Sequence, residues 1–152
     1  MTNAYLPEGL LIAKPENQAY LSSLQGLEQA LLQGRILEAT ALLCDNTLRL
    51  HIDLGGMRGY IEKQECLYCR PGESIKDIAV ITRVGKPVCF KVMRIERDEN
   101  GPYAVLSRRL AQQECYHSYL SDLMNGDIIP AKVTHLENFG AFVDIGCGIS
   151  SL

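Results

Sequence analysis

Two phenylalanines near the end of the chain have the spacing of a binding surface. Phe139 and Phe142 bracket Gly140 in the phrase Phe-Gly-Ala-Phe-Val-Asp. On a regular strand these rings point to opposite faces, so a turn or a bulge near Gly140 must bring them together. Rings exposed on one face form a platform on which nucleobases stack, at roughly 1–3 kcal/mol per base. The alternative is that one of the rings packs inside a core.

Basic and imidazole side chains supply the remaining chemistry that an anionic polymer needs. Lys132 and His135 precede the two rings and are expected to contact phosphates or base edges. His51 is a further stacking candidate, whereas Tyr60 and Tyr103 are more typical of packing. The basic residues expected to attract phosphate weakly and salt-dependently are Arg35, Arg49, Arg58, Lys91, Arg94 and Arg97. The alternative for each of them is an ordinary solvated charge.

The six cysteines do not form a convincing metal motif. Cys66 and Cys69 make one CxxC, and Cys115 lies two residues before His117. A structural zinc site needs four ligands, usually from two such pairs, so we expect no metal and no cofactor. Without a secretory signal in the first 14 residues, the thiols are expected to be reduced and the protein cytoplasmic. No P-loop, HExxH or GxSxG motif is present, so no enzyme and no small-molecule substrate are predicted.

Composition places the chain among globular proteins. Its 152 residues are 47% hydrophobic and 22% charged, which excludes wholesale disorder and allows one domain or two small ones. No apolar run approaches the roughly 18 residues of a membrane span. The net charge of −3 conceals a mildly basic centre, because residues 34–109 hold 13 basic and 10 acidic groups between two acidic flanks. That asymmetry weakly favours a polyanionic partner.

The order of elements occurs twice. Tyr20, Leu24, Leu27 and Leu31 mark a helix between Pro15 and Gly34, and Ala111, Cys115, Tyr119 and Leu123 mark a helix over 110–124 that stops before Gly126. After each glycine the apolar period changes to two, with strands predicted over 36–43, 48–54, 88–95 and 103–107, and again over 128–134 and 139–145. Residues 77–82 are expected to be a strand or a strand-like connector. His-Ile-Asp-Leu-Gly in the first copy corresponds to Phe-Val-Asp-Ile-Gly in the second, which indicates an internal repeat.

These phrases carry a family resemblance. Gly126-Asp127-Ile128, Lys132-Val133-Thr134 and the run from Phe139 to Gly146 resemble the opening of the S1 RNA-binding domain of the small-subunit ribosomal protein S1 family. In the first copy, 92–96 and 105–109 resemble the closing strands of that domain. The resemblance implies a mainly β fold with flanking helices: a five-stranded OB-fold barrel, followed by the start of a second, truncated OB-fold. It also implies single-stranded RNA and the small ribosomal subunit as partners, with no membrane association.

The first copy departs from the family pattern. Leu48 stands where the second copy has Phe139, His51 stands in place of Phe142, and Glu62 replaces a common histidine. We therefore expect a degenerate first domain over 34–109, after a helical segment over 1–33 and before a linker helix over 110–125 and a truncated second domain over 126–152. Two alternatives stay open: the first barrel docks onto a protein, or the chain is the RNA-binding appendage of an RNA-processing enzyme.

Overall fold

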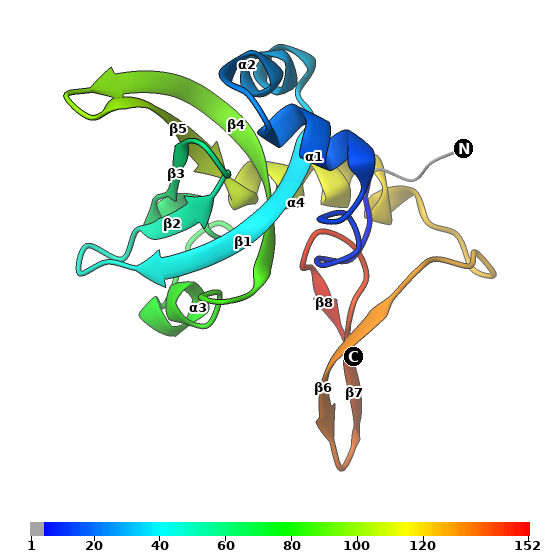
Figure 1. Ribbon diagram of the computed structural model, residues 1–152. Coiled ribbons are helices and arrows are strands. Elements are labelled where there is room, and N and C mark those ends of the chain that lie inside the picture. Colours follow the sequence, from blue (N-terminus) through cyan, green and yellow to red (C-terminus); the bar gives the residue numbers. More distant parts are fainter. Residues whose placement is uncertain (1–4) are drawn as a thin grey trace.

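The computed structural model describes residues 5–152, which form a closed five-stranded barrel, flanking helices and a second small sheet (Figure 1). The barrel strands are β1 (Ile36–Cys44), β2 (Leu50–Asp53), β3 (Arg58–Ile61), β4 (Pro87–Asp98) and β5 (Gly101–Ser107). They close in the order β1-β2-β3-β5-β4, and only β3 and β5 of this ring run parallel. The predicted mainly β fold with an OB-like barrel is confirmed.

Strand alternation divides the barrel residues into a core set and a surface set. Leu50 and Ile52 of β2 are buried, while His51 between them is only half-buried and faces outward. Phe90 of β4, which is fully buried, fills the centre of the same core.

The N-terminal helical stripe forms two helices instead of one. α1 (Pro15–Leu21) and α2 (Leu24–Gln33) are separated at Ser22 and Ser23. Ser23 caps α2, since its hydroxyl accepts a hydrogen bond from the Gly26 amide at 2.9 Å. Gly34 ends α2 at a φ of +64°, as predicted for the residue after the last turn. Leu21, Leu27 and Ala30 join the barrel core. Residues 1–4 of the predicted 1–33 segment lie outside the described residues.

The prediction of a strand or strand-like connector over 77–82 is wrong. This segment forms the short helix α3 (Asp77–Ile81), after a 3-10 turn at Lys63–Glu65. Its β-branched residues favour a strand locally, but the closed barrel leaves no strand edge on which they could pair. One helical turn instead buries Val80 and leaves Ile78 and Ile81 exposed.

The linker helix is shorter than the sequence pattern suggests. α4 (Arg108–Ser118) begins at Ser107, whose hydroxyl accepts the Leu110 amide at 3.0 Å, and only a 3-10 turn at Leu120–Asp122 follows it. Ala111 and Cys115 are buried on the predicted face, but Leu123 lies beyond the helix. Within residues 5–152, no helix has the length and apolar character needed to cross a membrane.

The second sheet projects away from the barrel as a hairpin (Figure 1). It contains β6 (Lys132–Glu137), β7 (Gly140–Asp144) and β8 (Ser150–Ser151) in that order. β6 starts at Lys132 and not at Ile128, so Pro130 lies outside the ladder, where its missing amide hydrogen costs nothing. Every residue of β6 is exposed.

Candidate nucleic-acid interface

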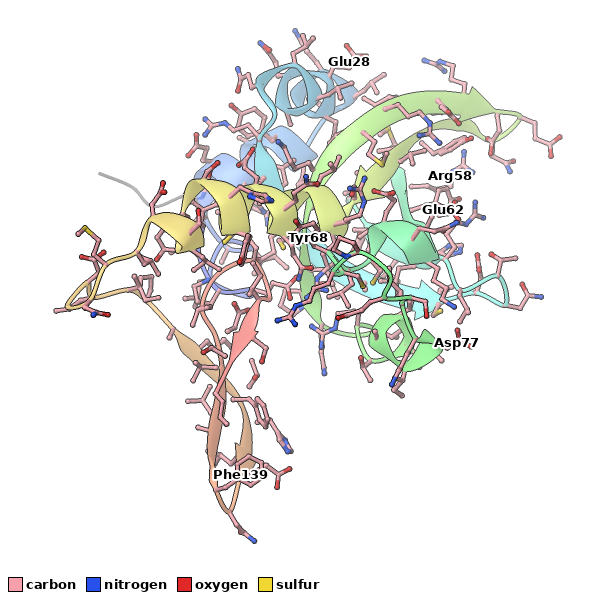
Figure 2. The ribbon with its side chains drawn as sticks, turned by 180° about the vertical axis from the view of Figure 1, so that it is seen from behind. Glu28, Arg58, Glu62, Tyr68, Asp77 and Phe139 are labelled. Carbon is pink, nitrogen blue, oxygen red and sulfur yellow. The ribbon has the colours of Figure 1, made fainter. Side chains whose placement is uncertain are left out.

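The tip of the hairpin gathers three aromatic or imidazole rings. Phe139 lies in the turn between β6 and β7 and is 70% exposed, and Figure 2 shows it at the far end of the projection. Its ring meets Phe142 edge-on, with centroids 6.2 Å apart. The His135 ring also contacts Phe142, with centroids 6.1 Å apart. Neither phenylalanine is buried in a core, so both rings retain surface for stacking.

Two backbone features bring these rings together. The turn removes Phe139 from the strand alternation, and Gly140 follows it at a φ of +155°. A bulge in β6 between Val133 and His135 shifts the register, so that His135 faces Phe142 across the strands. The expected turn near Gly140 is therefore present and brings Phe139 to Phe142. The bulge lies in β6 and not at Gly140, and it brings His135 to Phe142.

Lys132 does not join this cluster. Its ammonium donates to the main-chain carbonyl of Glu8 at 3.2 Å, at the base of the hairpin. The His135 imidazole contacts the Glu137 carboxylate, with Nε2 and Oε1 2.6 Å apart. Of the two residues expected to assist the phenylalanines, the structure brings only His135 to them.

The barrel carries a second row of rings across β2, β3 and β5. His51 meets Tyr60 edge-on at 4.9 Å, and Tyr60 meets Tyr103 at 5.6 Å. Tyr60 is 9% exposed, and the Arg49 guanidinium lies over its ring at 4.2 Å. This agrees with a packing role for Tyr60. An open groove of about 530 Å³ runs beside His51 and Arg58.

Five of the six basic candidates are paired with carboxylates, whereas the exposed Arg97 of β4 has no such partner among the described residues. Arg58 donates two hydrogen bonds to Asp98, at 2.9 and 2.7 Å. Asp45 binds both Arg49 and His51, at 3.3 and 2.9 Å. The other pairs are Lys91–Glu114, Arg94–Glu96 and Arg35–Glu16. A phosphate that binds these cations must therefore compete with a carboxylate already in place.

The pairing stabilises the ionised carboxylates. Hydrogen bonds from Thr47 and His51 hold the pKa of Asp45 well below its usual range. The Arg58 guanidinium likewise lowers the pKa of Asp98. Sequence reasoning selected Arg49, Arg58 and His51 but missed these two acidic partners. The only sequence signal was that the basic centre holds nearly as many acidic groups as basic ones.

The cysteines are all free thiols. Cys66 is buried and Cys69 half-buried, while Cys115 packs with Cys89 and Cys147 in a second apolar cluster. Burial raises the pKa of Cys89 to about 11, which keeps this thiol protonated at neutral pH. Within the described part of the chain, no group of three or more His, Cys, Asp or Glu side chains is arranged to hold a metal ion.

The relatives of this chain among known proteins include several small ribosomal subunit proteins bS1. The chain is 26% identical to the small ribosomal subunit protein bS1 of Staphylococcus saprophyticus over 126 residues, which cover 83% of this chain and 30% of that protein. It is 28% identical to bS1 of Staphylococcus haemolyticus over 149 residues, 91% of this chain and 36% of the relative. For bS1 of Mycobacterium leprae the identity is 30% over 101 residues, 66% of this chain and 20% of the relative.

These matches confirm the resemblance to the S1 family that the repeat phrases suggested. No family model matches the chain. The chain spans about a third or less of the length of these curated relatives.

Proposed function

We propose that this chain, which contains an S1-like domain, binds single-stranded RNA as a non-enzymatic, ribosome-associated protein of the cytoplasm that acts in translation. In this proposal the second sheet is the start of a second S1-type unit over 126–152, and the barrel over 34–109 is the first. The observation that carries the proposal is the pair of rings at the hairpin tip, where Phe139 is 70% exposed beside Phe142. Exposed rings that accept any base suit an unstructured RNA.

The internal repeat supports the choice of Phe142. Aligned on Asp53 and Asp144, the two copies place His51 where Phe142 stands, and His51 points outward from the first barrel. Its neighbours Leu50 and Ile52 point into that barrel. A ring at this position in both copies, facing outward from the barrel in the first, favours a binding role over a packing role.

The test is a titration of the full chain with labelled oligo-U at two salt concentrations. Phe139→Ala and Phe142→Ala should each weaken binding by about 1–3 kcal/mol, a factor of roughly 5 to 150. Tyr116→Ala is the matched control, because Tyr116 is an aromatic residue of α4 that is 49% exposed and lies outside both ring rows. Unchanged affinity in both phenylalanine variants would refute the proposed platform.

The carboxylate pairing of the first barrel favours a second candidate function for that barrel, the docking of a protein. Arg58 and Arg94 are both engaged by acidic partners, and the open groove beside Arg58 also contacts Leu42 and Met57. A mixed apolar and charge-balanced surface suits a protein partner better than a polyanion. If Phe139→Ala and Phe142→Ala abolish oligo-U binding but the chain is still retained on small ribosomal subunits, the barrel is the docking module. Loss of both activities together would argue against it.

A further inference from the structure

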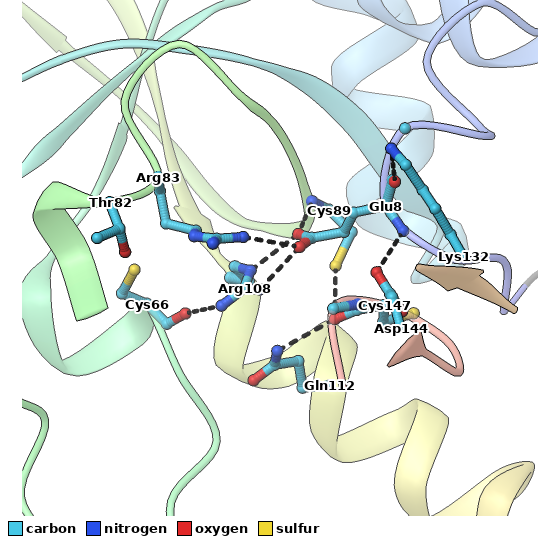
Figure 3. A network of polar contacts seen from close by, with 12 residues as sticks. Glu8, Cys66, Thr82, Arg83, Cys89, Arg108, Gln112, Lys132, Asp144 and Cys147 are labelled. Carbon is cyan, nitrogen blue, oxygen red and sulfur yellow. Dashed lines mark hydrogen bonds and ion pairs between the residues drawn. The ribbon is translucent and has the colours of Figure 1, made fainter. Parts of the chain in front are cut away.

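The segment from Tyr5 to Gly9 lies between the first barrel and the second sheet and contacts both (Figure 3). On the barrel side, the Glu8 carboxylate accepts two hydrogen bonds from Arg108, each 2.8 Å long. It also accepts the Cys89 amide at 2.8 Å, and Arg83 lies 3.5 Å away. Glu8 is 6% exposed and Arg108 3%, so this ion pair is withdrawn from water.

The main chain of the same residue is bonded to the second sheet. The Glu8 amide donates to Asp144 Oδ2 at 2.8 Å, and the Glu8 carbonyl accepts Lys132 Nζ. Two residues earlier, the Leu6 carbonyl accepts the Cys147 amide at 2.9 Å. Residue 8 therefore holds the barrel with its side chain and the hairpin base with its backbone.

The turn over residues 146–148 closes directly on the barrel. The Cys147 carbonyl accepts the Gln112 amide group at 3.1 Å and the Cys89 thiol at 3.4 Å. A Cβ at Gly148 would collide with Arg108 Nη2 and Glu8 Oε1. At the corresponding turn of the first copy, Gly55 and Gly56 have nothing within 4 Å of such a Cβ. The glycine turn of the first copy is thus free of close contacts, whereas that of the second copy is packed against Arg108 and Glu8.

The buried charges of this network require one another. Burial opposes ionisation of Glu8, but the Arg108 guanidinium, together with the Cys89 amide and Arg83, outweighs it and lowers the Glu8 pKa. A buried charge that loses its partner is strongly unfavourable, so Glu8 and Arg108 require each other. Asp144 is also held in place by hydrogen bonds, because its Oδ1 accepts the Gly146 and Gly148 amides at 2.9 and 3.1 Å. The buried partners thus come from the N-terminal segment, the barrel end with α4, and the second sheet.

We propose that the segment Tyr5–Gly9 is a clasp that fixes the second sheet in one orientation on the first barrel. The clasp joins the two units through Glu8 and acts together with the direct contacts of Cys147 on Gln112 and Cys89, so its disruption loosens the hairpin base without opening the barrel. This inference stands on the buried contacts alone and does not depend on RNA binding.

The test compares the full chain with Gly148→Ala and Glu8→Gln. The readout for the clasp is the alkylation rate of Cys147, a free thiol that is 1% exposed, followed with N-ethylmaleimide and peptide mass spectrometry. The readout for the barrel is amide hydrogen exchange in β1. We expect Cys147 to react at least tenfold faster in Gly148→Ala while β1 stays as protected as in the unmodified chain. Glu8→Gln should act in the same direction.

Gly72→Ala is the matched control for backbone strain. Gly72 has a φ of +87°, close to the +76° of Gly148, but nothing lies within 4 Å of its Cβ position. It should leave Cys147 protected. The clasp is refuted if Cys147 in Gly148→Ala reacts as slowly as in the unmodified chain. It is equally refuted if β1 exchange rises in parallel with alkylation, since the hairpin would then open only when the barrel unfolds.

Discussion

At the residue scale, acidic side chains decide what the basic ones can do. Arg58 lies over the Tyr103 ring at 5.2 Å in a cation–π contact. Its guanidinium is nevertheless engaged by Asp98 in a bidentate pair. The sequence predicted the cations of this surface, but a pair 40 residues apart in the chain carries no local signal. The pairing therefore emerges only when β3 and the end of β4 come together in the barrel.

The first residue-scale prediction is a gain of RNA binding in Asp98→Asn. Releasing Arg58 should add about one phosphate contact and steepen the dependence of log affinity on log salt by about 0.7. The measurement is an oligo-U titration at several salt concentrations. Glu99→Gln, which changes the net charge equally at an exposed neighbouring position, is the control. An identical salt slope in both variants would mean that Arg58 is not a phosphate-binding residue.

The second residue-scale prediction concerns the pH dependence of stability caused by Glu38, a side chain of β1 that is 1% exposed. Its carboxyl accepts the Gly9 and Ile12 amides at 2.7 and 3.0 Å. Burial nevertheless raises the pKa of Glu38 to about 7. In the unfolded chain this group titrates near 4.5, so between those values the folded state holds a proton that the unfolded state has lost. The free energy of unfolding should therefore fall as pH rises through that window.

The measurement is chemical denaturation of the full chain and Glu38→Gln from pH 4.5 to 8. The glutamine keeps an acceptor oxygen but cannot ionise. Relative to Glu38→Gln, the unmodified chain should lose about 3 kcal/mol across this range. A pH-independent difference between the two proteins would show that Glu38 titrates normally in the folded state.

At the scale of elements, the hydrophobic pattern of the sequence predicted most element types correctly but placed their boundaries poorly. The alternating runs that became β1, β2, β4 and β5 were each assigned to the right element, because one face of each strand is buried. The run over 77–82 has the same local composition but became α3, since a closed barrel has no edge to offer it. Strand pairing is a property of the whole sheet, and short β-branched segments do not encode it alone.

The division of the first helical segment gives an element-scale prediction. Ser23→Ala removes the hydroxyl that caps α2 and should reduce the free energy of unfolding by about 1 kcal/mol. Ser22→Ala is the control, because its exposed hydroxyl only donates to the Ala19 carbonyl within the preceding turn. Equilibrium denaturation in urea measures both. If the two serines cost the same, the break between α1 and α2 is not set by capping.

At the scale of the whole molecule, the sequence predicted the internal repeat but not the contacts between the barrel and the second sheet. The phrases that contain Asp53 and Asp144 predict two related units. Glu8, which bonds to the second copy through its backbone and to the first through its side chain, belongs to neither phrase. Gly148 could be recognised only as a turn residue, because the reason for it is a contact with Arg108 and not a local conformation alone. Long-range buried pairs of this kind need the folded structure.

If the barrel takes RNA in place of a protein, and the hairpin tip and the clasp act as proposed, the clasp determines how a long RNA is bound. An oligo-U of about twenty nucleotides can reach both the hairpin tip and the barrel, whereas one of about six can occupy only a single site. A fixed joint holds the two sites ready for the same strand and so raises the effective concentration of the second contact. Gly148→Ala should therefore weaken binding of the long oligonucleotide while the short one binds as before, measured by fluorescence anisotropy. An unchanged ratio of the two affinities would mean that the barrel and the hairpin do not share one RNA, even where the alkylation of Cys147 shows that the clasp exists.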